Sequence, residues 1–115
     1  MTVTERANGA VTVLDVAGNI TMGESTHILR DKVRSLLQQG SKQLLINLAG
    51  VSYMDSGGLG EMVQSYATVT RQGGTLKLVN ATKRLQDLLV ITRLSTVFDS
   101  FDDEIEAVRS FGAGV

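Results

Sequence analysis

A short, almost continuous apolar run at residues 44–48 constrains the fold of this chain more than any other feature. It reads Leu-Leu-Ile-Asn-Leu, a pattern that suits a strand buried on both faces of a parallel sheet. The segments before and after it have apolar residues at helical spacing instead. Those residues are Leu29, Val33, Leu36 and Leu37 before the run, and Leu59, Met62, Val63 and Tyr66 after it. Buried strand and amphipathic helix therefore alternate.

Turn signals and apolar periodicity predict the other elements. An antiparallel hairpin is predicted over residues 2–17, turning at Asn8-Gly9, with further strands at 75–79 and 96–98. Helices are predicted from a capping box at Thr21–Glu24 to Gly40, and over 56–72, 83–91 and 102–109. Residues 49–55 are expected to form a connection, and 111–115 a frayed tail. This order predicts one α/β domain with a mixed, mainly parallel sheet, right-handed crossovers, an N-terminal antiparallel hairpin and about four helices.

Composition narrows the class of protein. With 115 residues, 43% hydrophobic and 20% charged, the chain suits one folded domain rather than disorder. It contains no cysteine, so disulfides and thiolate metal sites are excluded. The absence of long apolar runs and of an apolar N-terminal signal predicts a cytoplasmic protein with no membrane insertion. A formal charge of −1 with two Tyr, three Phe and no Trp argues against nucleic acid as the partner.

The run Met54-Asp55-Ser56-Gly57-Gly58-Leu59-Gly60 is the candidate functional segment. It follows the strand at 44–48, and functional groups in open α/β sheets collect beyond the carboxyl ends of the strands. Ser56 is either a helix cap or a functional serine, since serine is a favoured N-cap. Each of the two glycines costs roughly 1 kcal/mol relative to alanine inside a helix. We therefore expect them to permit either tight packing or the close approach of another molecule.

The whole pattern resembles the anti-sigma factor antagonists of the STAS domain family. In that family the acceptor serine lies in a motif of the form Asp-Ser-(Ser/Ala/Gly)-Gly-Leu-Gly, and Asp55–Gly60 matches it between strand and helix. Gly18, the Gly73-Gly74 pair and the run Leu88–Leu94 followed by Val97-Phe98 fit as well. The resemblance predicts a single STAS domain over residues 1–115, with its core at about 3–110. Two departures are Asn19-Ile20, where many relatives have Leu-Asp, and Asn47, where an aspartate is common; both are expected to alter the polar surroundings of the site.

The resemblance implies a mechanism of partner switching centred on phosphorylation of Ser56. The unmodified protein would bind an anti-sigma factor, itself an ATP-dependent serine kinase, and so free the sigma factor. Phosphorylation by that kinase would abolish binding, and a serine phosphatase would reset the protein. The expected partner contacts are Asn19, Thr21, Met22, Met54, Asp55, Ser56, Gly57 and Gly58. For Met22 and Met54, ordinary packing is the alternative. No catalytic residue, cofactor or metal is implied.

Other interpretations fit fewer residues. Asp55-Ser56-Gly57-Gly58 is similar to the nucleophile segment of chymotrypsin-like proteases, but the only histidine is His27, predicted on the first helix. The glycine segment lacks the Lys-Ser/Thr ending of a phosphate-binding P-loop. The acids at 102–104 are better explained as a helix start than as a metal site. Within the same family, a soluble regulatory or scaffold subunit of a transporter or sensory complex is the main alternative. The oligomeric state, a weak homo-oligomer included, is left open.

Overall fold

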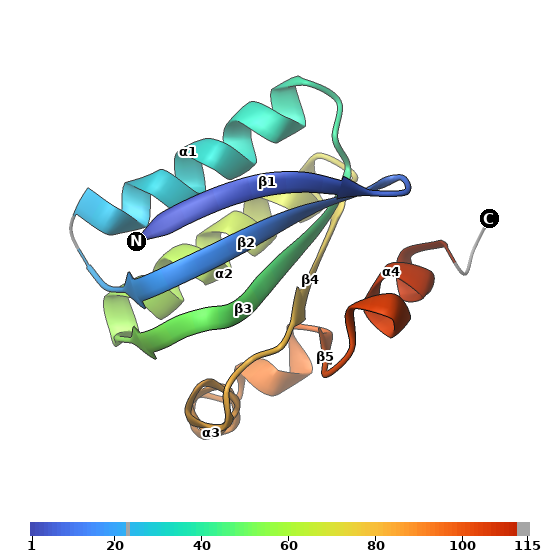
Figure 1. Cartoon of the computed structure of the whole chain (residues 1–115). Helices are drawn as coiled ribbons and strands as arrows, with labels where there is room; N and C mark the ends of the chain where they lie inside the picture. The colour runs from blue at the N-terminus through green and yellow to red at the C-terminus, as the bar shows by residue number, and fades with distance from the viewer. Residues whose placement is uncertain (23, 113–115) are drawn as a thin grey trace.

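In this computed structural model, a five-stranded sheet has helices on both of its faces (Figure 1). The structure describes residues 1–22 and 24–112, and for residues 24–26 it describes the backbone alone. The elements are β1 (Thr2–Asn8), β2 (Val11–Ile20), α1 (Glu24–Gln38), β3 (Gln43–Met54), α2 (Ser56–Arg71), β4 (Thr75–Val79), α3 (Lys83–Ile91), the 3-10 turn η1 (Leu94–Thr96), β5 (Ser100–Phe101) and α4 (Glu104–Gly112). The strand order is β1-β2-β3-β4-β5; β1 pairs antiparallel with β2, and the other pairs are parallel. The predicted fold class is confirmed.

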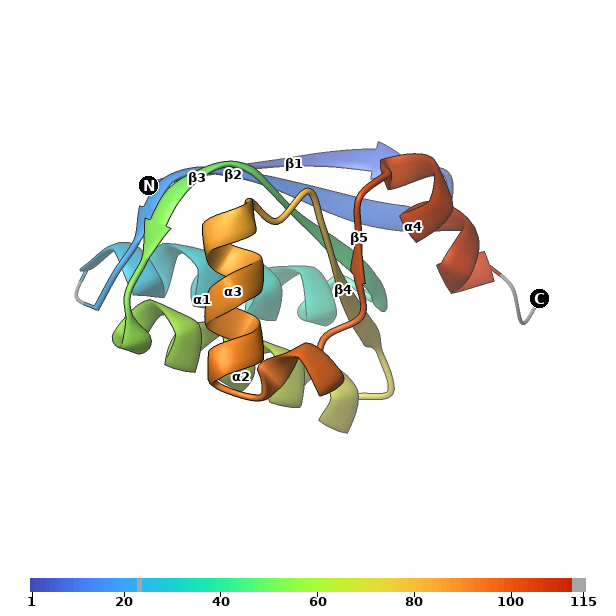
Figure 2. The same cartoon turned by 90° about the horizontal axis from the view of Figure 1, so that it is seen from below.

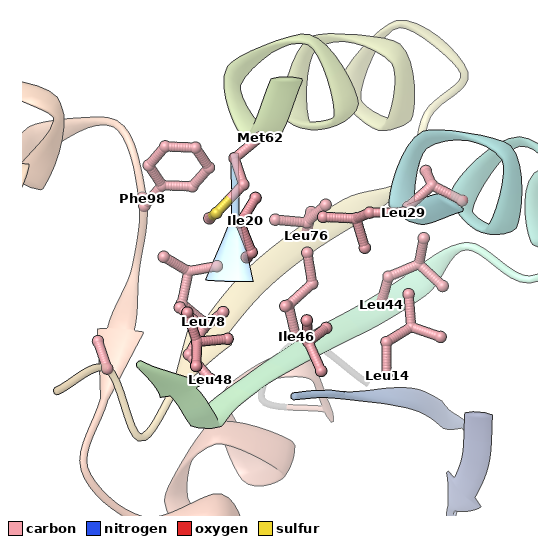
Figure 3. Close-up of a cluster of buried hydrophobic side chains, with 14 of the residues drawn as sticks. Leu14, Ile20, Leu29, Leu44, Ile46, Leu48, Met62, Leu76, Leu78 and Phe98 are labelled. Atoms are coloured by element: carbon pink, nitrogen blue, oxygen red, sulfur yellow. The ribbon is translucent and has the colours of Figure 1, made fainter. Parts of the chain in front are cut away.

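Two hydrophobic cores lie on opposite faces of this sheet. The larger one packs α1, α2 and α3 against the strands, and the smaller one packs α4 (Figure 2). Figure 3 shows Met62 of α2, Leu29 of α1 and Phe98 meeting the strand side chains of the larger core. In β3, Leu44, Ile46 and Leu48 belong to the larger core and Leu45 to the smaller. The prediction that residues 44–48 are buried on both faces is therefore confirmed.

The prediction of a connection at residues 49–55 is wrong, because β3 continues to Met54. Its pairing with β2 continues through two register shifts until Ile20 lies opposite Met54. Val51 and Met54 still face the larger core, but Ala49, Gly50 and Ser52 are exposed. Cross-strand backbone pairing thus persists where one face of the sheet is uncovered, and the apolar pattern that predicted the strand is lost there.

Near the C-terminus, the strand predicted at 96–98 is also wrong. Phe98 is an anchor of the larger core, 2% exposed, with its ring edge-on to Tyr66 at a centroid distance of 5.3 Å. The last strand is β5 at Ser100–Phe101, and the last helix begins at Glu104 rather than Asp102. Phe111, expected in a frayed tail, lies in α4 and is buried. Residues 113–115 of that predicted tail lie outside the described residues.

The N-terminal boundaries differ less from the prediction. Asn8 pairs with Val11, so the hairpin turns at residues 9 and 10, and Gly9 adopts a φ of +62° there. Glycine accepts this left-handed conformation without the steric cost that other residues incur. The capping box predicted at Thr21–Glu24 includes residue 23 and the Glu24 side chain, which lie outside the described residues. In the described part of the chain, no helix combines the length and apolarity needed to cross a membrane.

A chain of polar contacts ties α4 to the edge hairpin. Arg6 of β1 donates to Asp15 of β2 at 2.7 Å and to Glu104 of α4 at 2.5 and 2.8 Å. Asn8 donates to the same Glu104 carboxylate at 2.8 Å. The Arg6 hydrogen bonds hold the pKa of both carboxyl groups below their usual range, against the opposing effect of burial. Arg6 therefore links two carboxylates that stay charged at neutral pH.

We expect Arg6→Gln to lower the free energy of unfolding near neutral pH, because it removes the ion pairs with Asp15 and Glu104. The loss should be only about 1 kcal/mol, because these ion pairs are partly exposed and are screened by solvent. A carboxyl pKa that is lower in the folded state stabilises the fold above about pH 4, and this contribution is lost as pH falls through the folded value. The difference between wild type and Arg6→Gln should therefore shrink as pH is lowered below about 4 in urea titrations. Lys32→Gln, which removes the exposed pair with Glu5 at 3.1 Å, is the control. A difference independent of pH would contradict the role given to the carboxylates.

Candidate functional site

Ser56 is the exposed first residue of α2, at the edge of the sheet where β2 and β3 end (Figure 1). The N-cap of the helix is Asp55, whose extended backbone (φ −96°, ψ 179°) lets its carboxylate accept a hydrogen bond from the Gly58 amide at 2.7 Å. Asp55, not Ser56, therefore caps the helix. Within the described part of the chain, the Ser56 hydroxyl has no hydrogen-bond partner. Its side chain is available to another molecule.

Asp55 also joins α2 to the end of β2. Its carboxylate accepts from the Met22 amide at 3.1 and 3.2 Å, and its own amide donates to the Ile20 carbonyl at 3.2 Å. The Gly58 amide foremost, with help from the Met22 amide, holds the Asp55 pKa below its usual range, although desolvation opposes this. Ser56 is therefore next to a carboxylate that is charged at neutral pH and fixed in position.

Tight packing explains the glycine pair. A Cβ added at Gly58 would lie 2.0 Å from the Ile20 carbonyl oxygen, and one at Gly57 would lie 2.5 Å from the Met22 Cβ. The first contact is with backbone that is itself hydrogen-bonded to Asp55. Of the two explanations expected for these glycines, packing within the chain is thus the one observed. The pair lets the end of β2 lie directly against the first turn of α2.

The expected partner-contact residues lie around the junction of β2 and β3 with α2, but their exposed fractions differ. Met22 is 76% exposed, and Asn19 is also exposed, its side chain accepting a hydrogen bond from the Ser52 hydroxyl at 2.8 Å. Thr21 is half-buried. Met54, in contrast, is only 6% exposed and packs in the larger core, as the packing alternative expects. Gly58 is buried as well, and contributes by allowing close packing.

The two departures from the family pattern lie in different places. Asn19 is at the end of β2 beside Ser52, close to the junction with α2. Asn47 is in the middle of β3 and faces the α4 side, where it donates to Asp15 at 2.8 Å and accepts from Asn80 at 3.2 Å. Asn47 therefore extends the Arg6 network. The expectation that it shapes the polar surroundings of Ser56 is wrong, because its side-chain hydrogen bonds are with Asp15, the Ala49 amide and Asn80.

A groove beside Ser56 was not predicted from the sequence. It has a volume of about 750 Å³ and lies between α3 and the junction of β3 with α2. The lining residues are Tyr53, Met54, Asp55, Ser56, Lys83, Arg84, Leu85, Asp87, Leu88 and Ile91. Tyr53 and Ile91 are 44% and 78% exposed. One feature of the sequence could have indicated this groove: Ile91 is apolar but does not lie on the inward face of α3 that Leu85 and Leu89 form.

Neither of the other chemical readings of this segment, a serine nucleophile or a metal site, finds a supporting group in the part of the chain that the structure describes. His27 is exposed on α1, and its ring contacts Arg30 on the same helix. Ser56 has no base hydrogen-bonded to it among the described residues. The described residues also contain no group of three or more His, Cys, Asp or Glu side chains placed to hold a metal ion. What the site presents is an exposed hydroxyl beside a fixed carboxylate.

The family profile of the STAS domain matches residues 2–107 of this sequence, almost the whole chain. The chain belongs to the STAS domain family. This STAS domain is 44% identical over 86 residues to the anti-sigma-B factor antagonist of Bacillus subtilis (strain 168), covering 75% of the chain and 77% of that relative.

Solved structures of two other proteins share the fold. An anti-sigma factor antagonist from Mycobacterium paratuberculosis superimposes with a TM-score of 0.82 at 20% identity, covering 95% of this chain and 92% of that one. The Bacillus cell-fate determinant SpoIIAA in its phosphorylated form superimposes with a TM-score of 0.74 at 18% identity, covering 96% and 99%. At 18–20% identity, the similarity to these two structures establishes the fold alone. The evidence that bears on function is the 44% identity to the anti-sigma-B factor antagonist.

Proposed function

We propose that this STAS domain is an anti-sigma factor antagonist that acts by partner switching. The unphosphorylated form binds an anti-sigma factor serine kinase, and the sigma factor held by that kinase is released. The kinase then transfers the γ-phosphoryl group of ATP to the Ser56 hydroxyl and loses affinity for the product. A serine phosphatase removes the phosphate and restores binding. Because the kinase requires ATP, the proposed location is the cytoplasm.

One observation carries the proposal: the free, exposed Ser56 hydroxyl begins α2 in a chain 44% identical to an anti-sigma-B factor antagonist. The hydroxyl is accessible, and no neighbouring base among the described residues makes it a catalytic group. That combination suits a substrate of another enzyme better than an enzyme. The identity to an antagonist also favours this role over that of a transporter subunit.

The local electrostatics suit a switch that leaves the fold intact. A phosphoserine carries about −1.5 to −2 charges at pH 7. At position 56 the backbone amides and dipole of α2 tolerate that charge within the domain. A partner packed over the same spot would instead bury a second anion beside the charged Asp55, and an unpaired buried charge is strongly unfavourable. We therefore expect phosphorylation to act on the interface rather than on the stability of the domain.

Incubation of the chain with ATP and each anti-sigma factor kinase of its source genome, followed by mass mapping, tests the proposal. We expect one kinase to modify Ser56 alone and to leave Ser56→Ala unmodified. Ser52→Ala is the matched control, because Ser52 is also exposed at the end of β3. Modification of Ser52 instead of Ser56, or no modification by any of these kinases, would contradict the proposal.

A further inference from the structure

Helix α3 presents two neighbouring apolar side chains to solvent on different sides. Ile91 is 78% exposed and lines the groove that contains Ser56. Val90 is 62% exposed and lines a separate hollow formed with Phe98 and residues near it. Leu85 and Leu89 supply the buried face of the same helix. Ile91 is therefore not needed for packing of the domain, and its position in the groove is open to another role.

The groove and Ser56 are parts of one surface. Ser56 and Asp55 line the groove together with residues of α3 and the buried side chains of Met54 and Leu85. An enzyme that brings the γ-phosphate of ATP to the Ser56 hydroxyl must therefore lie over the groove. Its volume of about 750 Å³ is enough to receive several side chains of that enzyme.

Charge on the α3 residues that line the groove indicates what kind of segment fits. Lys83 and Arg84, in the first turn of α3, line the groove, and neither has an ion pair among the described residues. Asp87 lies one turn further along the helix. Cations at the start of a helix are disfavoured by its dipole, so an acidic group placed there by a partner would meet two cations without partners.

We infer that α3 is the docking element for the kinase, in a role that rests on the function proposed for Ser56. A segment of the kinase inserts an apolar side chain between Tyr53 and Ile91 and places an acidic side chain against Lys83 and Arg84. Large apolar side chains that enter a pocket beside a polar rim carry most of the energy in such interfaces. In this division of roles, α3 selects the kinase, and Ser56 controls whether the selected kinase stays bound.

Paired substitutions on α3 separate docking from general effects on the helix. Ile91→Glu puts a charge into the groove, and Val90→Glu puts the same charge on the next residue, outside it. Using the kinase that modifies Ser56, we expect Ile91→Glu to weaken binding in calorimetry at least tenfold and to lower kcat/KM for Ser56 phosphorylation similarly. Val90→Glu should change both less than twofold. Both positions are exposed, so thermal melting should show that both variants stay folded.

The outcomes distinguish this inference from the function on which it rests. Equal losses for Ile91→Glu and Val90→Glu, or wild-type behaviour of Ile91→Glu, would overturn docking in the groove while Ser56 phosphorylation of the wild type still stood. The double variant Lys83→Glu, Arg84→Glu should bind at least tenfold more weakly, and because it faces the acidic group with like charge, its remaining binding should strengthen with added salt where wild-type binding weakens. Unchanged binding would overturn the acidic contact. If no kinase binds or modifies the wild type, both the proposed function and the docking role fail.

Discussion

Replacing Gly58 with alanine is expected to destabilise the domain by about 3 kcal/mol, whereas alanine at Gly60 is expected to stabilise it. A Cβ at position 58 would lie 2.0 Å from the Ile20 carbonyl oxygen and 2.6 Å from its carbon. That backbone is the end of β2 and accepts a hydrogen bond from Asp55, so it cannot move away without breaking the junction. At Gly60, on the same helix, an added Cβ meets nothing within 4 Å.

Urea unfolding monitored by circular dichroism measures both effects. Gly60→Ala should raise the free energy of unfolding by roughly 0.5–1 kcal/mol, because alanine costs less conformational entropy than glycine in a helix. The contrast between two glycines in one helix separates helix propensity from steric contact. If Gly58→Ala were neutral or stabilising, the close packing of β2 on the start of α2 would be wrong.

Ser56→Asp is expected to weaken kinase binding about 100-fold, equivalent to about 2.7 kcal/mol, by placing a carboxylate beside the charged Asp55. Ser56→Asn, which has the same size without the charge, should bind within about threefold of Ser56→Ala. Ser56→Ala itself should bind like the wild type but escape the switch. Calorimetry with the kinase measures all three variants, and thermal melting checks that the fold is retained.

Similar affinities for Ser56→Asp and Ser56→Ala would show that charge at this position does not control the complex. A loss shared by Ser56→Asp and Ser56→Asn would point to side-chain size instead of charge. Charge repulsion is supported as the physical basis of the switch only if Ser56→Asp binds much more weakly than Ser56→Asn.

The order of strands and helices could be predicted because, in most segments, the spacing of apolar residues stays that of a strand or that of a helix from end to end. Leu44 and Ile46 belong to the larger core and Leu45 to the smaller, so this stretch of β3 appears as an apolar run. The inward residues of α1 repeat at helical spacing. The second half of β3 could not be predicted in this way, since Ala49 and Ser52 face no helix. Phe98 likewise fills the larger core from irregular backbone, where neither period applies.

The position of Ser56 at the start of a helix could be predicted from the sequence, but its surroundings could be predicted only in part. The motif indicated an exposed serine at the start of a helix, but only the geometry assigns the cap to Asp55 and the glycines to contacts with Ile20 and Met22. These contacts join segments that are more than 30 residues apart. The groove depends on where α3 crosses the end of β3, which local patterns do not encode.

The most direct test compares three states of the wild-type chain: unmodified, stoichiometrically phosphorylated at Ser56, and treated afterwards with a serine phosphatase. Calorimetry against the kinase should show tight binding, then loss of binding by at least 100-fold, then recovery of the original affinity. Thermal melting should give nearly the same midpoint in all three states. Undiminished binding of the phosphorylated chain, or loss of binding through unfolding, would contradict a switch that acts at the surface of this domain.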